Sequence, residues 1–198
     1  MFSRYVRRYV QNHAIPDPGI SGFPPANFDG VAELWFDTAD DLVAALRDPS
    51  YQDSVASSVD RFADRDSTIL VAAEESVQFD RGFGEVKFIG LSKRPADFTH
   101  DEWVRYWIDV HGPMAHDIPE FTQYYGRYVH NYVVSLDAEA VATTEDYDGI
   151  VEEWIRSAED FARCLEEPRY LEIVRPDELK FVDIARSHFL LAQEQLIA

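Results

Sequence analysis

Cysteine is nearly absent from this sequence, which has a single one, Cys164, among 198 residues. One thiol excludes an internal disulfide and any zinc site built from several cysteines. Long apolar runs are also absent, and no segment approaches the roughly 20 residues that a membrane-spanning helix needs. The arginines near the N-terminus are not followed by the apolar stretch of a signal peptide. These absences predict a cytoplasmic protein that does not enter a membrane.

Basic residues are scarce, since 18 Lys and Arg stand against 37 Asp and Glu, a formal net charge of −19. Phosphate groups require the opposite sign, so neither nucleic acid nor an anionic membrane is an expected partner. A solvated acidic surface accounts for the excess. With 46% hydrophobic and 14% aromatic residues, the chain can still bury a sizeable core.

Several motifs that mark cofactor and nucleophile sites are missing. The chain has no glycine-rich phosphate loop, no nucleophile elbow and no Cys–His pair, which argues against NAD, ATP and acyl-serine chemistry. His111 and His116 are five residues apart across a Gly-Pro break, whereas a helical zinc pair is four apart. The sequence therefore predicts neither a metal nor a cofactor.

The strongest local pattern begins at Thr99. Thr99 and Glu102 have the spacing of a capping box, in which each side chain satisfies a free backbone N–H at a helix start. Trp103, Trp107 and Val110 follow at helical period and form one apolar stripe. The pattern predicts an amphipathic helix packed through its tryptophans.

His111 lies one turn beyond Trp107, on the same face of the predicted helix. Gly112 suits the left-handed position after a helix end and Pro113 cannot continue a helix, so the helix is expected to stop there. Two interpretations of His111 stay open: a capping residue that completes the core, and a group for proton transfer near neutral pH.

The chain repeats itself at a constant offset of 119 residues. Asn12 recurs as Asn131 and Trp35 as Trp154, without any insertion. Such self-similarity predicts a duplicated module. Further matched pairs are Phe2/Phe121, Tyr5/Tyr124, Arg8/Arg127, Tyr9/Tyr128, Val10/Val129, Asp29/Asp148, Gly30/Gly149, Glu33/Glu152 and Pro49/Pro168.

The second module, residues 85–198, has the element order β-α-β-β-α-β of a ferredoxin-like unit. The first, residues 1–79, starts only at the second strand, because Glu85 would map to a position before Met1. Fold class α+β is predicted, with tandem ferredoxin-like modules packed into a barrel. Strands are expected over residues 2–14, 31–36, 68–76, 85–92, 121–134, 150–155 and 186–197, and helices from residues 38, 99 and 157.

Period-two alternation assigns the strand residues to two faces. We assign the polar and aromatic sets to the barrel interior and the apolar sets to the helix side. Aromatic walls with a few titratable groups are typical of a small-molecule pocket; a packed core is the alternative. The predicted interior residues are Tyr128, His130, Tyr132, Glu152 and Trp154, with Tyr9, His13, Glu33 and Trp35 opposite.

Three segments together resemble the EthD family. They are Lys93-Arg94-Pro95, the His111-Gly112-Pro113 corner, and Tyr128-Val129-His130-Asn131. The last segment departs from the family pattern, with His130 where a Gln is usual and Tyr132 where a His is usual. The resemblance implies a dimeric α/β-barrel fold, a proton-transfer role for His111, and Asn131 among the residues that bind substrate.

The leading hypothesis is a cofactor-independent lyase, dehydratase or isomerase for a small apolar or aromatic substrate. His111 is the expected general acid or base, His130 the second proton-transfer group, and Tyr128 and Tyr132 hold a substrate oxygen. Two alternatives remain: a non-catalytic binding or accessory protein, and a haem protein in which His188 or His130 is the axial ligand. The missing opening strand and helix of the first module either lie upstream of Met1 or are truly absent. If they are absent, a homodimer is a candidate assembly, because a sheet edge is left to cover.

Overall fold

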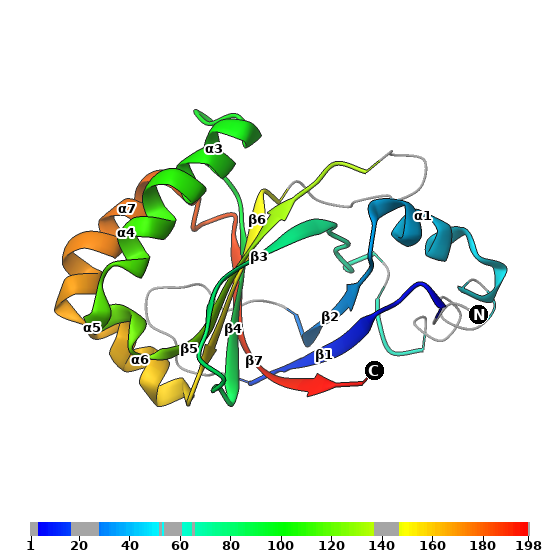
Figure 1. Cartoon of the computed structure of the whole chain (residues 1–198), viewed down its shortest axis with the longest axis horizontal. Helices are drawn as coiled ribbons and strands as arrows, with labels where there is room; N and C mark the ends of the chain where they lie inside the picture. Colours follow the sequence, from blue (N-terminus) through cyan, green and yellow to red (C-terminus); the bar gives the residue numbers. More distant parts are fainter. Residues whose placement is uncertain are drawn as a thin grey trace.

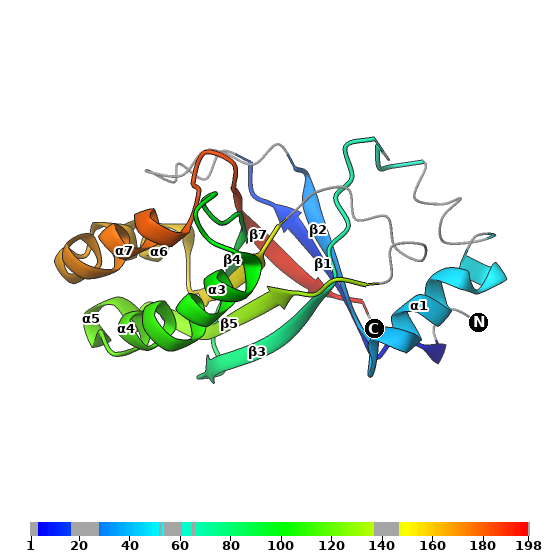
Figure 2. The same cartoon turned by 90° about the horizontal axis from the view of Figure 1, so that it is seen from above.

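The protein folds as a curled, seven-stranded antiparallel sheet with most of its helices on one face, as the computed structural model shows (Figures 1 and 2). The structure describes residues 4–16, 28–51, 53, 61–64, 66–136 and 147–197. The strands are β1 (Arg8–Ala14), β2 (Gly30–Trp35), β3 (Ala73–Asp80), β4 (Val86–Ser92), β5 (Tyr125–Val133), β6 (Gly149–Ile155) and β7 (His188–Leu196). The helices are α1 (Ala39–Arg47), α3 (His100–Tyr106), η3 (Trp107–His111), α4 (Gly112–His116), α5 (Pro119–Thr122), α6 (Ala158–Glu166), η4 (Tyr170–Val174) and α7 (Arg175–Phe181).

The strand order is β2-β1-β7-β4-β6-β5-β3. Its central part, β7-β4-β6-β5, is the order of a ferredoxin-like sheet, so the predicted α+β fold class is confirmed. The N-terminal strands extend this sheet at both edges, because β1 pairs with β7 and β3 pairs with β5. The sheet thus curls into an open barrel that lacks a ladder between β2 and β3 among the described residues.

The convex face of the central strands carries the main core. Strand β4 is buried along its whole length, and Phe88 stacks on Phe161 of α6 and Phe189 of β7. The capping box at Thr99 forms as predicted, and Ser157 caps α6 by accepting from the Asp160 amide. In the described part of the chain, no helix has the length and apolarity to cross a bilayer.

The predicted helix end at His111 is wrong. The chain continues from α3 through one π-helical turn, η3, into α4, and Gly112 is right-handed with φ −58°. Pro113 lies in the first turn of α4, directly after the π turn, and the wider turn accommodates a ring that would clash with the carbonyl four residues back in a regular α-helix. The extra residue of the π turn also changes the direction in which the following side chains point. Val110 is therefore 44% exposed, although it was expected in the apolar stripe with the two tryptophans.

The face assigned to β5 is also wrong. Tyr128, His130 and Tyr132 face the helices, whereas Asn131 faces the barrel interior and donates to Glu152 at 2.9 Å. The assignment of polar and aromatic strand residues to the barrel interior fails here, because the helix layer itself presents indole rings that pack against these aromatic side chains. The register of β5 also shifts around Gly126, where the Phe83 carbonyl approaches too closely for any side chain.

Candidate active site between the helices and the sheet

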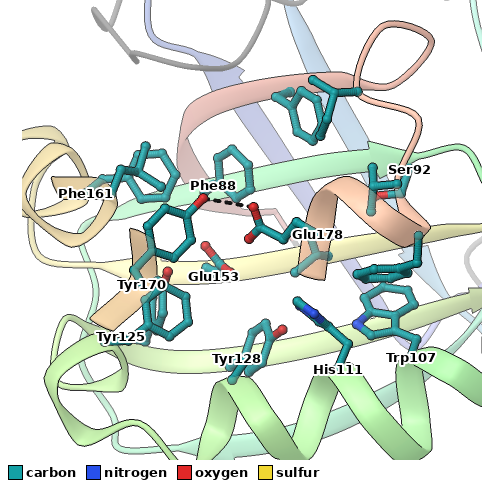
Figure 3. A pocket seen from close by; sticks show the side chains of 18 of the residues that line it. Phe88, Ser92, Trp107, His111, Tyr125, Tyr128, Glu153, Phe161, Tyr170 and Glu178 are labelled. Atoms are coloured by element: carbon teal, nitrogen blue, oxygen red, sulfur yellow. Dashed lines mark hydrogen bonds between the residues drawn. The ribbon is translucent and has the colours of Figure 1, made fainter. Parts of the chain in front are cut away.

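A cavity of about 60 Å³ lies between the helix layer and the convex face of the sheet (Figure 3). Its walls are largely aromatic, with one histidine and two carboxyl groups among them. The lining includes Phe88, Trp103, Trp107, His111, Phe121, Tyr125, Tyr128, Glu153, Tyr170, Glu178, Phe181 and Phe189.

His111 is held in this cavity by a buried carboxylate. Its Nδ1 lies 3.0 Å from Oδ2 of Asp177 on α7. Asp177 also accepts from the Tyr106 hydroxyl at 2.6 Å and from Lys180 Nζ at 3.2 Å. Burial opposes ionisation, but the hydrogen bonds from His111, Tyr106 and Lys180 lower the pKa of Asp177 to about 2. Asp177 is therefore a carboxylate at neutral pH.

This carboxylate fixes the tautomer of His111. An ionised Asp177 only accepts, so Nδ1 of His111 carries the proton and donates it. The described residues supply no hydrogen-bond partner to Nε2, the other ring nitrogen. The ring packs on Phe181 at 4.5 Å and is 5% exposed. The π turn thus places the His111 imidazole in the aromatic cavity, where Asp177 fixes its orientation and Nε2 carries the lone pair.

Two glutamates enter the same cavity from β6 and α7. Figure 3 shows Glu153 and Glu178 converging with His111 from three different elements. Burial, reinforced by the nearby Glu178, raises the pKa of Glu153 to about 8, against an opposing hydrogen bond from Tyr125. Glu153 is therefore protonated at neutral pH and can donate a proton.

Glu178 is the more strongly hydrogen-bonded of the two carboxyl groups. Burial raises its pKa, while His111, Arg175 and Tyr170 act in the opposite direction. The Tyr170 hydroxyl donates to Oε2 of Glu178 at 2.9 Å, and Arg175 donates to the same oxygen at 3.0 Å. The two carboxyl groups therefore differ in their partners, although burial raises the pKa of both.

Tyr128 lines the cavity, as a predicted substrate-binding tyrosine should, but on the helix side of the sheet. Burial raises its pKa well above the ordinary value, so its hydroxyl remains a neutral donor. Tyr132 lies farther along β5, and its hydroxyl is 3.2 Å from Nδ1 of His130.

His130 does not line the cavity. Its ring is 1% exposed and packs against Trp107 at 4.3 Å and Tyr128 at 4.7 Å. Burial, together with the nearby His111, lowers the pKa of His130 to about 3, so the ring is neutral. A side chain at Gly112 would approach within 3.1 Å of His130 Cε1. In this position His130 supports the π turn that carries His111.

Five further predicted site residues lie on the opposite, concave face: Glu33, Trp35, Asn131, Glu152 and Trp154. Glu152 and Glu33 meet there around Lys87, whose Nζ is 2.5 Å from Glu152 Oε1 and 2.7 Å from Glu33 Oε1. Lys87 Nζ also lies 4.3 Å above the Trp154 ring. Trp35 belongs to the same face and donates to Glu75 at 2.9 Å. The sheet therefore separates these residues from His111.

Tyr9 and His13 do not face the barrel interior, contrary to prediction. Val10 and Asn12 are the buried residues of β1, at 0% and 2% exposed, while His13 is exposed. The error is the same as in β5, because the two strands were assigned together through the 119-residue offset.

Sequence reasoning did not single out Asp177, Glu153, Glu178 or Lys87. A signal existed for Glu153, since a carboxyl group at a position assigned to the apolar helix side needs an explanation. Lys87 gives a similar signal, a charge inside the otherwise apolar strand VKFIGLS. Asp177 and Glu178 lie 66 or more residues from His111 in sequence, and only the folded structure brings them together.

Comparison with known proteins places the chain in a family. The profile of the EthD domain matches residues 2–66 and 95–185. A curated relative, the conidial pigment biosynthesis dehydratase EthD of Metarhizium robertsii (strain ARSEF 23 / ATCC MYA-3075), is 52% identical over 42 residues, which cover 21% of this chain and 30% of the relative. The chain therefore matches less than a third of that relative's length.

A solved structure, of a proposed monooxygenase from Lactobacillus acidophilus NCFM, aligns over 98% of this chain and 96% of its own. The TM-score is 0.46 and the sequence identity 10%. Because the EthD profile covers well over half of the residues, this chain belongs to the EthD domain family.

Proposed function

We propose that this protein is an acid–base lyase, most specifically a dehydratase, for a small aromatic or apolar substrate that binds between the helices and the sheet. The observation that carries the proposal is the His111–Asp177 pair, which opens into an aromatic cavity that also holds a protonated Glu153. A paired base and acid with opposite protonation states is what elimination of water requires. The dehydratase named among the relatives supports the same reaction class.

In the proposed reaction, Nε2 of His111 removes a proton from the carbon beside a carbonyl group. The resulting imidazolium is stabilised by Asp177, which stays ionised. The C–O bond at the next carbon then breaks, and Glu153 gives its proton to the departing hydroxyl, which leaves as water. Tyr128 donates a hydrogen bond to the carbonyl oxygen. Glu153 thus takes the second proton-transfer role first expected of His130, and the cavity replaces the barrel interior as the substrate site.

The test is a panel of aryl β-hydroxy ketones, whose dehydration gives conjugated enones that absorb in the near ultraviolet. Wild-type protein should dehydrate at least one of them. The His111→Gln variant should lose about 10²–10⁴-fold in rate, the usual contribution of a positioned acid–base group. His116→Gln is the matched control, because the His116 side chain is 52% exposed and lies outside the cavity lining. Equal rates for wild type and His111→Gln would refute the mechanism.

A non-catalytic binding or accessory role is the second candidate. The largely aromatic lining of the cavity favours it, because such walls can hold an apolar ligand without acting on it. Under this alternative, apolar aromatic compounds bind between the helices and the sheet and leave unchanged. Saturation-transfer NMR would then detect binding that survives His111→Gln, with no product at any enzyme concentration.

The haem alternative finds no support in the surroundings of its candidate ligands. His130 is packed between Trp107 and Tyr128. His188 contacts the rings of Phe28 and Tyr147 at 5.2 and 6.1 Å. Neither imidazole lines the cavity between the helices and the sheet.

A further inference from the structure

The strand order leaves one position of a closed barrel vacant among the described residues. Strand β4 pairs with β6 on one side and with β7 on the other. By the 119-residue offset, β6 corresponds to β2 and β7 to β3, yet β2 and β3 are not joined by any described strand. Each of the two strands therefore has one edge that pairs with no described strand.

The vacant position is one strand wide. Trp154 on β6 donates to Glu194 on β7 at 3.2 Å, and this hydrogen bond spans β4, which lies between the two strands. Trp35 on β2 makes the corresponding bond to Glu75 on β3 at 2.9 Å. Strands flanking a single neighbour lie about 9–10 Å apart. The same pair of side chains therefore bridges a filled strand position in one half of the barrel and an unfilled one in the other.

The arginines that stack on the two tryptophans also correspond between the halves. Arg127 stacks on Trp154 at 4.8 Å and lies 3.5 Å from Glu75. Arg8 stacks on Trp35 at 4.5 Å and lies 3.5 Å from Glu194. The two halves thus have matching indole, guanidinium and carboxylate groups.

One cation has no counterpart. Lys87, the second residue of β4, pairs most closely with Glu152 and Glu33. It also lies 3.6 Å from Glu194 and above the ring of Trp154. Within the described residues, Glu75 and Trp35 receive no such lysine. The vacant position therefore offers two strand edges that no described strand pairs and, on its inward side, the Glu75 carboxylate beside the Trp35 indole.

From this geometry we propose that β2 and β3 are the docking site for one extended donor strand, contributed by a partner polypeptide, that carries an inward-facing lysine. The donor completes an eight-stranded barrel by pairing with β2 and with the residues leading into β3. Its backbone satisfies these two edges, which is the usual mode of strand addition. Its lysine reaches Glu75 and the face of Trp35, as Lys87 reaches Glu194 and Trp154.

Residues 85–92 of this chain, EVKFIGLS, supply the probe, because β4 already fills the equivalent position. A synthetic peptide of this sequence should bind and slow hydrogen exchange at the backbone amides of residues 31–35 and 69–77. The same peptide with Lys87→Glu should bind at least about tenfold more weakly, since it sets a carboxylate against Glu75. A scrambled peptide is the composition control.

Protein variants distinguish an effect of the Glu75 charge from nonspecific binding of the peptide. Glu75→Gln should weaken the lysine peptide about tenfold, whereas Glu159→Gln, which changes the same charge on a side chain that is 75% exposed on α6, should not. Equal binding of the native and scrambled peptides, or binding without protection of β2 and β3, would overturn the proposal. So would a homodimer that protects these edges by itself, because the occupant would then be a second copy of this chain.

Discussion

At the scale of single residues, the chemistry of the cavity depends on which groups keep their protons at neutral pH. His111 could be identified from the sequence because its segment has no counterpart at the 119-residue offset and because the EthD resemblance points to it. Asp177 and Glu153 could not, because α7 and β6 bring them to His111 from distant parts of the chain. Glu153 carries an acidic proton only because burial beside Glu178 raises its pKa, and sequence spacing does not report burial.

The pKa of Glu153 gives the activity a predicted upper pH limit. Because Glu153 must be protonated to act as the acid, the rate should fall as pH rises through about 8. Glu153→Gln cannot donate a proton, so its rate should be about 10²-fold lower and should not decline through that range. A pH–rate profile of both proteins checks this. Glu166→Gln, at an exposed position of α6, should keep the wild-type profile, and a wild-type rate that is flat to pH 10 would contradict the assignment.

At the scale of elements, the order β-α-β-β-α-β was predictable because alternation and capping signals are local. Two errors arose for different reasons. The helix end was wrong because the π turn η3 lets the helical segment continue past His111, and a pattern with a fixed period cannot locate such a turn. The face of β5 was wrong because its aromatic side chains pack on indole rings of the helix layer, and alternation alone does not report which face meets the helices.

Gly149 shows how closely the elements approach one another. The Asp148-Gly149 pair predicts a turn, but Gly149 opens β6, directly beneath the indole rings of Trp103 and Trp107. A Cβ there would lie 2.8 Å from Cη2 of Trp103 and still closer to Trp107. Gly149→Ala should therefore lower the free energy of unfolding by about 1–3 kcal/mol through overpacking. Urea denaturation measures the change, and an unaltered midpoint would show that the helix layer tolerates displacement.

At the scale of the whole molecule, the sequence predicted that two related halves build one barrel, and this division stays a prediction. The contacts of Trp35 with Glu75 and of Trp154 with Glu194 correspond at the 119-residue offset. The position of β3 was not predictable, since it pairs with β5 rather than with its own half. Strand pairing between halves depends on the curl of the whole sheet. The halves also share an acidic, half-buried interior, where burial and the neighbouring Glu152 raise the pKa of Glu33 to about 8.

This interior gives the stability a predictable pH dependence. Glu33 and Glu153 both have folded-state pKa values near 8, above the ordinary value of 4.5. A raised carboxyl pKa favours the folded state fully below pH 4.5, and this contribution is lost as pH rises to about 8. The free energy of unfolding should therefore decline over that interval, and Glu33→Gln and Glu153→Gln should each reduce the slope. Urea titrations at several pH values test this against Glu166→Gln, and identical slopes in all four proteins would exclude the two groups.

The central claim, proton removal by His111 in the cavity, can be isolated from the loss of water. An aryl ketone that lacks the leaving hydroxyl is incubated with protein in D₂O, and NMR follows deuterium uptake at the carbon beside the carbonyl. Wild type and Glu153→Gln should both exchange, since Glu153 acts only on the leaving group. His111→Gln should exchange about 10²–10⁴-fold more slowly. Undiminished exchange in His111→Gln would contradict the account.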